Sequence, residues 1–433
     1  LAREEAIGKD HSQRITNIKE EQEKTETELK KLTEKWESEM EVATRIREIY
    51  QEIQDIYGNQ DEKNGEEELG KLQNELKESE KEFEKKHKGD PLVQITVDSN
   101  IISSVISGWT GIPTGSMLSD EIKTVLELSQ HLKKRVIGQD YGLEAIEQVV
   151  QTTHAGIEDP SKPTGVFMLV GPSGVGKTET ALALSDLLYG GEQNMITINM
   201  SEYQEAHTVS SLKGSPPGYV GYGEGGVLTE AVRRKPYSVV LLDEVEKAHT
   251  DVTELFYQVF DKGFMEDGEG RVIDFKNTLI ILTSNLGTDL IMSLCQDEET
   301  KPEAKALSEM LGPELQKHFK PAFLGRMKII PYLPLTDDNM KKIIALKLNH
   351  IVKRMRVNQG IEFKYNKNII DAIAKRCTEV DSGARNVDHI LTDTLLPEMS
   401  RRILGKMAQN EHIGQIIVDL DGDGFKFTLK NIV

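Results

Sequence analysis

The chain has 433 residues, too many for one ordinary domain, and its 72 Asp and Glu outnumber 53 Lys and Arg, for a formal charge of -19. So acidic a surface repels phosphate backbones, which excludes nucleic acid as an expected partner. The two cysteines, Cys295 and Cys377, are too far apart for a CxxC motif, and no apolar run approaches the roughly 20 residues that span a bilayer. We therefore predict a cytoplasmic protein of two or three domains, without membrane insertion.

Residues 1–92 predict a pair of charged helices. Between residues 14 and 57, apolar side chains recur mostly at steps of three, four or seven, which is typical of an amphipathic helix. Turn formers at 58–65 interrupt this pattern, and residues 69–83 resume it. The prediction is a helical hairpin, either a solvated pair with one buried face or a coiled-coil arm that meets a partner. Because the chain starts at Leu1 inside a helical pattern, we expect it to be a piece of a longer protein.

Residues 131–335 predict an α/β domain with a parallel sheet flanked by helices. Helical stretches alternate there with short apolar runs at 166–170, 195–198, 239–242, 279–283 and 329–332. Residues 93–130 are interpreted as a linker with leading helices. Residues 336–433 are mostly helical but end in a predicted β hairpin, which indicates a small C-terminal α/β lid domain.

The strongest chemical signal is a complete G-x-x-x-x-G-K-T sequence that directly follows the apolar run 166–170 and precedes a helical stretch. Its glycines let backbone N–H groups wrap phosphates, and the N-terminus of the following helix favours anions. Lys177 would reach the β- and γ-phosphates of ATP, and Thr178 would ligate Mg²⁺. The predicted phosphate loop for ATP or ADP consists of Gly171, Pro172, Ser173, Gly174, Val175, Gly176, Lys177 and Thr178.

Two acids follow the apolar run 239–242. Asp243 would hold Mg²⁺ and Glu244 would polarise the attacking water as a general base. Such a run is a weak signal alone, but together with the phosphate loop it predicts hydrolysis. After the next apolar run, Asn285 would place an amide near the γ-phosphate if the strands are neighbours; the alternative is an ordinary turn or helix cap.

Three other residues stand in suggestive settings. Guanidinium groups stabilise charge on a transferring phosphoryl group, so of Arg326 and Arg385 one could act on the chain's own nucleotide and the other on a neighbour's. Spacing alone does not distinguish them from surface arginines. The glycine-rich stretch 214–223 follows no strand and has no lysine for phosphate, but Tyr219 within it could grip an extended polypeptide. The alternative for this stretch is a surface turn.

Together these motifs resemble the AAA+ superfamily and, from about residue 101 onward, the second ATPase module of the Clp/heat-shock disaggregases. Those proteins are hexameric rings that thread polypeptides through a central pore, so the resemblance implies a homohexamer with a protein substrate. The charged helices of residues 1–92 resemble part of the family's middle domain. The roles that the resemblance implies are adenine contact for Val136 and Ile137, nucleotide contact for Glu179, sensor 1 for Asn285, a finger that reaches the adjacent subunit's nucleotide for Arg326, sensor 2 for Arg385, and a substrate pore loop for Gly218, Tyr219, Val220 and Gly221.

Some stretches resemble the ClpV (TssH) branch of this family, the ATPases of bacterial type VI secretion, which dismantle contracted sheaths for reuse. They are 178–184, 188–192, 196–202, 260–263 and 323–326. The resemblance implies type VI sheath subunits as the substrate, and the lack of an Ile-Gly-Phe or Ile-Gly-Leu tripeptide disfavours a ClpP-type protease as partner. A general ClpB-like disaggregase and a nucleotide-binding scaffold without turnover remain alternatives. Glu244 argues against the scaffold, which has no use for a water-activating carboxylate.

Overall fold

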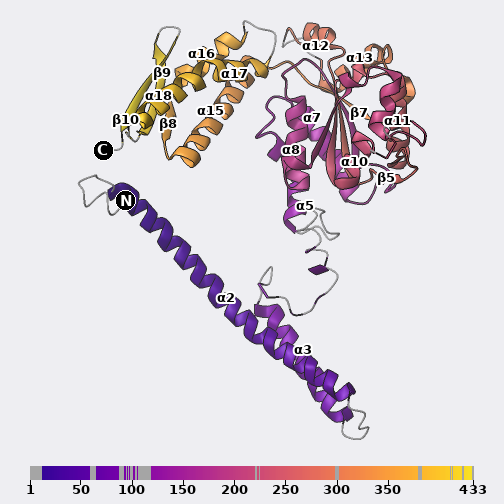
Figure 1. Ribbon diagram of the computed structural model, residues 1–433, viewed down its shortest axis with the longest axis vertical. Helices are drawn as coiled ribbons and strands as arrows, with labels where there is room; N and C mark the ends of the chain where they lie inside the picture. The colour runs from indigo at the N-terminus through magenta and orange to yellow at the C-terminus, as the bar shows by residue number, and fades with distance from the viewer. Residues whose placement is uncertain are drawn as a thin grey trace. The chain divides into compact units, whose positions relative to one another are not determined.

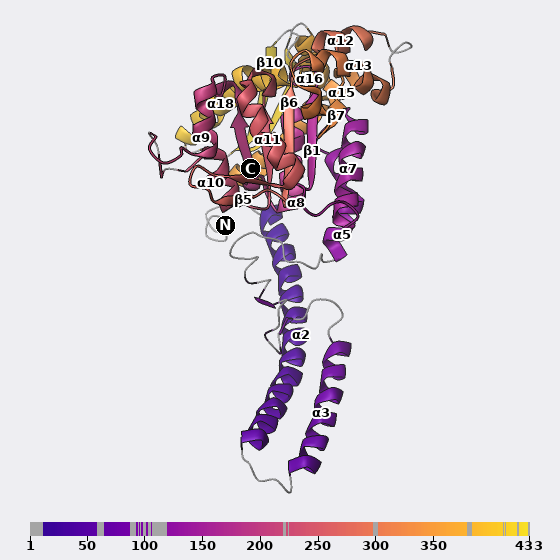
Figure 2. The same cartoon turned by 90° about the vertical axis from the view of Figure 1, so that its right-hand side faces the viewer.

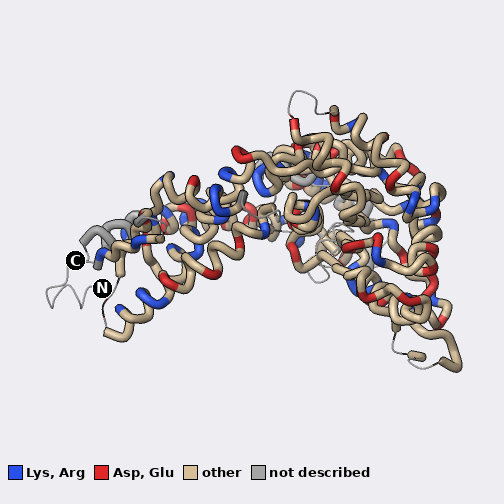
Figure 3. The backbone as a smooth tube through the Cα atoms, turned by 90° about the horizontal axis from the view of Figure 1, so that it is seen from above, with Lys and Arg blue, Asp and Glu red and all other residues tan. Residues whose placement is uncertain are grey.

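A computed structural model describes residues 12–58, 65–86, 92–93, 95, 97, 101–102, 105, 119–219, 222–223, 225–297, 302–378, 383–409, 411, 413–421 and 424–431. The chain divides into two compact units, residues 1–105 and 106–432. Acidic and basic residues are interspersed along the helices (Figure 3), so the charge of -19 is spread over many elements. Within the described ranges, no helix combines the length and the apolarity needed to cross a membrane.

The first unit is the predicted helical hairpin. Helices α2 (Ser12–Gly58) and α3 (Gly65–Lys86) lie side by side (Figures 1 and 2). Val42, Ala43, Ile46, Phe83 and Val93 form their small buried core. Glu39 is also fully buried, and its Oε2 accepts hydrogen bonds from the backbone N–H groups of Leu92 at 2.6 Å and Val93 at 3.1 Å. Since a buried carboxylate requires such donors, this contact fastens the segment after α3 to α2.

The second unit contains the predicted parallel sheet, with strand order β2-β3-β6-β1-β7. All five predicted strands are present, as β1 (Gly165–Val170), β2 (Met195–Asn199), β3 (Ser238–Asp243), β6 (Thr278–Ser284) and β7 (Lys328–Pro331). Side chains alternate between the two faces of the sheet. Phe167 and Leu169 pack with helices α6 (Leu128–Leu132), α7 (Asp140–His154) and α8 (Lys177–Tyr189). Met168 and Val170 pack with α10 (Val227–Arg234) and α11 (Thr250–Lys262) on the other face (Figure 1).

Between α11 and β6 the chain forms a short antiparallel hairpin that was not predicted from the sequence. Its strands are β4 (Phe264–Glu266) and β5 (Val272–Asp274). Strands of three residues are too short to show an alternating pattern. The other helices of this part of the unit are α5 (Ser119–Leu126), α9 (Val209–Lys213), α12 (Thr288–Leu294), α13 (Ala304–Gln316) and α14 (Pro321–Leu324).

The C-terminal part has a hydrophobic core of its own. Helices α15 (Asp337–Gln359), α16 (Lys367–Thr378), α17 (Ala384–Ile390) and α18 (Leu396–Ala408) accompany a three-stranded sheet of order β10-β9-β8. Its strands are β8 (Glu362–Tyr365), β9 (Ile413–Asp421) and β10 (Gly424–Asn431). The predicted terminal hairpin is thus confirmed, whereas the short strand β8 was not predicted. Ile344, Leu348 and Leu395 are fully buried in this core.

Candidate nucleotide-binding site

The predicted phosphate loop connects β1 to α8, as its sequence context indicated. Strand β1 ends at Val170 and α8 begins at Lys177. At Gly171 a Cβ atom would lie 2.4 Å from the backbone oxygen of Tyr332, so only glycine fits against the chain that leaves β7. Gly176 has a φ of 107°, which lets the loop turn into the helix without strain. The loop therefore presents the N-terminus of α8 at the carboxyl end of the sheet, where anions bind.

A cavity of about 410 Å³ lies over this loop. The residues that line it from the sheet side include Arg135, Val136, Ile137, Ser173 to Glu179, Asp243, Glu244, Thr283 and Asn285. The C-terminal part contributes Ile343, Leu346, Lys347, His350, Ala384, Arg385 and Asp388. The backbone N–H of Ala384 also donates to the carbonyl of Gly174 at 3.0 Å. The structure therefore gathers most of the predicted nucleotide residues, Arg385 among them, around one space.

Lys177 is a buried cation at the floor of the cavity. Its Nζ donates to the carbonyl oxygens of Gly171 at 2.5 Å and Pro172 at 2.9 Å, and to Asn285 Oδ1 at 2.9 Å. Gly171 and Pro172 thus contact Lys177 through their carbonyl groups and are not among the residues that line the cavity. Burial lowers the pKa of Lys177 to about 8, although Glu246 and Asp243 oppose the shift. A buried ammonium with three neutral acceptors gains most from an added anion such as phosphate.

The two predicted acids are tied to the neighbouring strand. The hydroxyl of Thr283 on β6 donates to Asp243 Oδ1 and accepts from the backbone N–H of Glu244 at 3.1 Å. Glu244 has a φ of 56°, the only positive value of a non-glycine residue in the described part of the chain. A left-handed conformation of this kind is typical of functional sites, where surrounding contacts hold it. Lys247 Nζ lies 2.7 Å from Glu244 Oε2.

Asn285 lies between these acids and the phosphate loop, as the strand order requires, because β6 is placed between β1 and β3. Its backbone N–H donates to Glu246 Oε1 at 3.1 Å, while Glu246 Oε2 is buried and has no hydrogen-bond partner among the described residues. No role was predicted from the sequence for Thr283, Glu246 or Lys247. A signal was available for Thr283, which is a polar residue near the end of an otherwise apolar strand.

The predicted adenine segment, Val136 and Ile137, is held against the phosphate-loop helix by its neighbours. Arg135 Nη2 lies 2.7 Å from both Glu179 Oε1 and Glu192 Oε1. Gln139 Nε2 donates to the carbonyl of Leu333 at 2.9 Å. Because these contacts fix both sides of the segment, its apolar residues form a preformed wall of the cavity. The sequence contained no signal for Arg135.

The structure separates the two candidate arginines. Arg385 lines the cavity, whereas Arg326 is not among its lining residues. Arg326 pairs with both carboxylate oxygens of Asp261, at 2.8 Å from Nε to Oδ1 and 2.8 Å from Nη2 to Oδ2. Its Cζ also lies 4.9 Å from the centroid of the Tyr257 ring. The Arg326 guanidinium holds the pKa of Asp261 below its usual range, so this ion pair stays charged at neutral pH.

The predicted pore loop connects α9 to α10, and none of its described residues lines the cavity. The Tyr219 side chain is 71% exposed and Tyr222 is 52% exposed. Val220 and Gly221 of the predicted motif lie outside the described residues. The backbone N–H of Tyr219 donates to the carbonyl of Pro216 at 3.2 Å, so this side of the loop is a turn with an exposed ring.

The order of the strands and the location of the cavity define a class of protein. The phosphate loop follows β1, the acids follow β3, and the strand between them ends at the predicted sensor amide. A small C-terminal domain contributes the remaining wall of the cavity. This is a P-loop nucleotide-binding protein of the AAA+ class.

Comparisons with known proteins specify the family. Residues 162–330 match the model of the AAA domain (Cdc48 subfamily), and residues 335–418 match the C-terminal, D2-small domain of ClpB protein. The probable chaperone protein ClpB 1 of Chlorobaculum tepidum is 36% identical over 421 residues, which cover 93% of this chain and 96% of that protein. The chain belongs to the Clp/heat-shock disaggregase family of AAA+ ATPases.

Two further relatives are larger than this chain. AAA+ ATPase ClpV1 of Pseudomonas aeruginosa strain PAO1 is 60% identical over 338 residues, which cover 78% of this chain and 38% of ClpV1. A closed-state cryo-EM reconstruction of Hsp104 with ATPγS and FITC-casein superimposes with a TM-score of 0.66 at 33% identity, over 78% of this chain and 56% of that one. The chain thus spans less than two fifths of the length of ClpV1.

Proposed function

We propose that the chain hydrolyses ATP and uses the energy to pull on a protein substrate, as one subunit of a hexameric ring that threads the substrate through a central pore. The observation that carries this proposal is the cavity, in which Lys177, Asp243, Glu244 and Asn285 converge on one space. Four such groups supply what hydrolysis of a phosphoanhydride requires: a cation for the phosphates, a metal ligand, a base and a polar contact for the γ-phosphate.

Each residue has a defined part in this proposal. Lys177 binds the phosphates and exchanges its carbonyl partners for phosphate oxygens. Thr178 and Asp243 offer hard oxygen donors on one cavity wall, the ligand type that Mg²⁺ prefers, and they would hold this ion. When bound, Mg²⁺ neutralises charge on the phosphates. Glu244 takes the proton of the attacking water, for which its carboxylate must separate from Lys247.

The arrangement of the arginines supports action between subunits. Arg385 lines the chain's own cavity and would contact its own nucleotide. Arg326 is held by Asp261 and Tyr257 and would complete the cavity of an adjacent subunit. Because charge on the transferring phosphoryl group needs such a cation, turnover would require assembly. The loop with the exposed Tyr219 would face the pore and grip the polypeptide.

We further propose that the substrate is the contracted sheath of a bacterial type VI secretion system, in the cytoplasm and without a ClpP-type protease. This finer proposal rests on the ClpV-type stretches of the sequence and on the 60% identity with ClpV1. A general ClpB-like disaggregase is the second candidate, because the ClpB 1 relative matches 93% of the chain. Incubation with ATP and either contracted sheaths or heat-aggregated protein distinguishes them: release of sheath subunits alone supports the first candidate, and clearing of aggregates supports the second.

The test of the motor is ATP turnover across a protein concentration series, with molar mass followed by light scattering. We expect turnover per subunit to rise as the chain assembles. Glu244→Ala should bind ATP but turn over about 10³-fold more slowly, the contribution of a general base. An assembled wild-type chain that binds ATP and does not hydrolyse it would contradict the proposal and favour a scaffold.

A further inference from the structure

The loop that carries Tyr219 leaves and re-enters the domain through a narrow neck made of three glycines. Gly214 follows α9, Gly226 precedes α10, and Gly268 lies in the turn between β4 and β5. Gly214 and Gly226 are buried, whereas the described residues of the loop between them are largely exposed. Three separate segments of the chain therefore meet at the base of one exposed loop.

In this neck, backbone packs directly against backbone. A Cβ atom on Gly226 would lie 2.3 Å from the carbonyl carbon of Lys213 and 2.5 Å from the nitrogen of Gly214. A Cβ atom on Gly268 would lie 2.5 Å from the carbonyl carbon of Gly214. Gly226 has an ordinary φ of -88°, so its backbone conformation does not call for glycine. The close approach of the neighbouring backbone does, because no side chain fits there.

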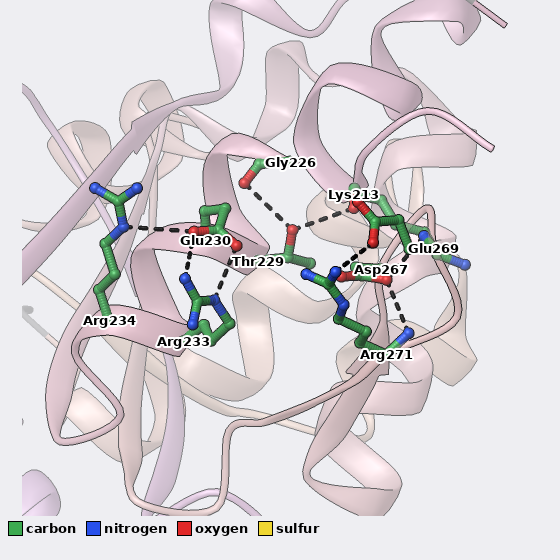
Figure 4. Close-up of polar contacts among 9 residues, drawn as sticks. All are labelled: Lys213, Gly226, Thr229, Glu230, Arg233, Arg234, Asp267, Glu269 and Arg271. Carbon is green, nitrogen blue, oxygen red and sulfur yellow. Dashed lines mark hydrogen bonds and ion pairs between the residues drawn. The ribbon is translucent and has the colours of Figure 1, made fainter. Parts of the chain in front are cut away.

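Hydrogen bonds join the same three segments, and Figure 4 shows those of Thr229 to the carbonyls of Lys213 and Gly226. The carbonyl of Lys213 accepts from Thr229 Oγ1 at 3.1 Å and from the N–H of Gly268 at 3.2 Å. Thr229 is 1% exposed, and its hydroxyl also lies 3.2 Å from the carbonyl of Gly226. Thr229 thus contacts both the segment that leads into the loop, at Lys213, and the segment that returns from it, at Gly226. Its loss would remove one of the two donors of each carbonyl, because Lys213 also accepts from the N–H of Gly268 and Gly226 from the N–H of Glu230.

The β4–β5 turn on the other side of the neck is stiffened by its own contacts. Asp267 is buried, and its Oδ1 accepts from the backbone N–H groups of Glu269 and Arg271, at 2.8 Å each. Arg271 Nη2 lies 2.5 Å from Glu269 Oε2 (Figure 4). The turn can therefore move as one body with the strands that bear it.

Those strands join the turn to the nucleotide residues along the chain. Strand β4 follows α11, whose Asp261 holds Arg326. Strand β5 leads to β6, which contains Thr283 and is followed by Asn285, and both of these residues line the cavity. A displacement of α11 or β6 would carry the turn with it, and Gly268 would pass the displacement to the neck.

We propose that Gly226, Gly268 and Thr229 are positioning residues that keep this neck rigid. Through the rigid neck, the β4–β5 turn moves the Tyr219 loop. This inference rests on the proposed function, because it specifies how the nucleotide site acts on the polypeptide grip. The neck requires glycine for its packing and the Thr229 hydroxyl for its hydrogen bonds. The chemistry of hydrolysis requires neither.

The test compares Gly226→Ala and Gly268→Ala with Gly312→Ala, a matched control in α13. An added Cβ there would meet no atom of the described residues within 4 Å outside the backbone of its own helix. ATP turnover is measured with and without unfolded casein, and chymotrypsin cleavage after Tyr219 and Tyr222 reports how firmly the loop is held. Both neck variants should keep basal turnover within about twofold and lose its stimulation by casein. Their loop cleavage should rise about tenfold above that of Gly312→Ala.

Thr229→Val provides a second variant if the alanine variants fail to fold. It keeps the side-chain volume and removes the hydroxyl, and we expect loop cleavage to rise about threefold. Cleavage and casein stimulation equal to those of Gly312→Ala, in whichever neck variants fold, would overturn the inference. A wild-type chain without ATP turnover would count against the proposed function alone, since the cleavage rates still decide whether the neck holds the loop.

Discussion

The nucleotide cavity and the neck of the Tyr219 loop are built in opposite ways. In the cavity, polar side chains are joined by hydrogen bonds at the edge of the sheet, Lys177 to Asn285 and Thr283 to Asp243. In the neck, backbone packs against backbone, and Gly226 and Gly268 make this close approach possible because they have no side chain. The cavity should therefore be sensitive to the loss of a functional group, and the neck to the gain of a methyl group. We therefore expect nucleotide turnover and movement of the Tyr219 loop to respond to different substitutions in one domain.

The largest effect on turnover among these predictions is expected for Arg326, which belongs to neither region. Its replacement tests whether the nucleotide cavity of one chain needs a residue from an adjacent subunit. Arg326→Ala should lower turnover of the assembled protein about 10³-fold, because a finger in trans stabilises transition-state charge. ATP affinity measured by fluorescent-nucleotide displacement should stay the same. Mixing Arg326→Ala with Glu244→Ala subunits should restore part of the activity, and a mixture that remains inactive would contradict action between subunits.

Thr283→Val tests whether side-chain hydrogen bonds set the geometry of the cavity. The change keeps volume but removes the hydroxyl that joins Asp243 to the N–H of Glu244. Loss of a hydrogen bond to a charged group should slow turnover about 30-fold, as steady-state kinetics would show. Thr283→Ser, which keeps the hydroxyl, should remain near wild type. Equal losses in both variants would mean that packing matters here and the hydrogen bond does not.

The lowered pKa of Lys177 predicts a pH dependence of nucleotide binding. The protonated amine binds phosphate, and burial lowers its pKa to about 8, so the charged fraction falls as pH rises above that value. Above this pKa, Lys177 must take up a proton when ATP binds, so ATP affinity should fall by up to about tenfold per pH unit. Titration calorimetry between about pH 7 and pH 9.5 measures this slope.

A matched variant isolates the lysine from other titrating groups. Lys177→Arg keeps its positive charge over the whole range, because an arginine in a protein does not lose its proton. Its affinity, even if lower, should change little with pH. A wild-type affinity that stays constant up to the alkaline limit would show that Lys177 remains charged in the nucleotide-free protein.

The smallest of these effects is expected at Tyr219, in the exposed loop that the neck holds. Tyr219→Ala should weaken binding of unfolded casein about fivefold, measured by fluorescence anisotropy, since one aromatic contact per subunit is lost. Basal turnover should not change. Tyr219→Phe keeps the ring and should bind nearly as wild type, whereas a loss as large as that of Tyr219→Ala would assign the contact to the hydroxyl group.

Much of the fold and of the nucleotide site follows from local patterns. The five strands of the parallel sheet appear as apolar runs, because strands covered on both faces need apolar residues at nearly every position. The phosphate loop is also predictable, since its glycines and Lys177 must lie within one short segment of the sequence to wrap a phosphate. The hairpin of α2 and α3 follows from helical periodicity, although the buried Glu39 within it does not.

Other features exist only once distant segments meet. The links between Thr283 and Asp243, between Arg135 and Glu192, and between Arg326 and Asp261 join residues 40, 57 and 65 positions apart. No spacing rule connects them, because strand order and helix packing set these distances. The neck is the extreme case, since Gly226 has an unremarkable backbone and only the approach of Lys213 and Gly214 explains it. By itself the sequence determined the strands and the short segment of residues that holds phosphate. The tertiary structure alone decided which side chains orient those residues and which backbone segments touch, because packing brings together residues that are far apart in the sequence.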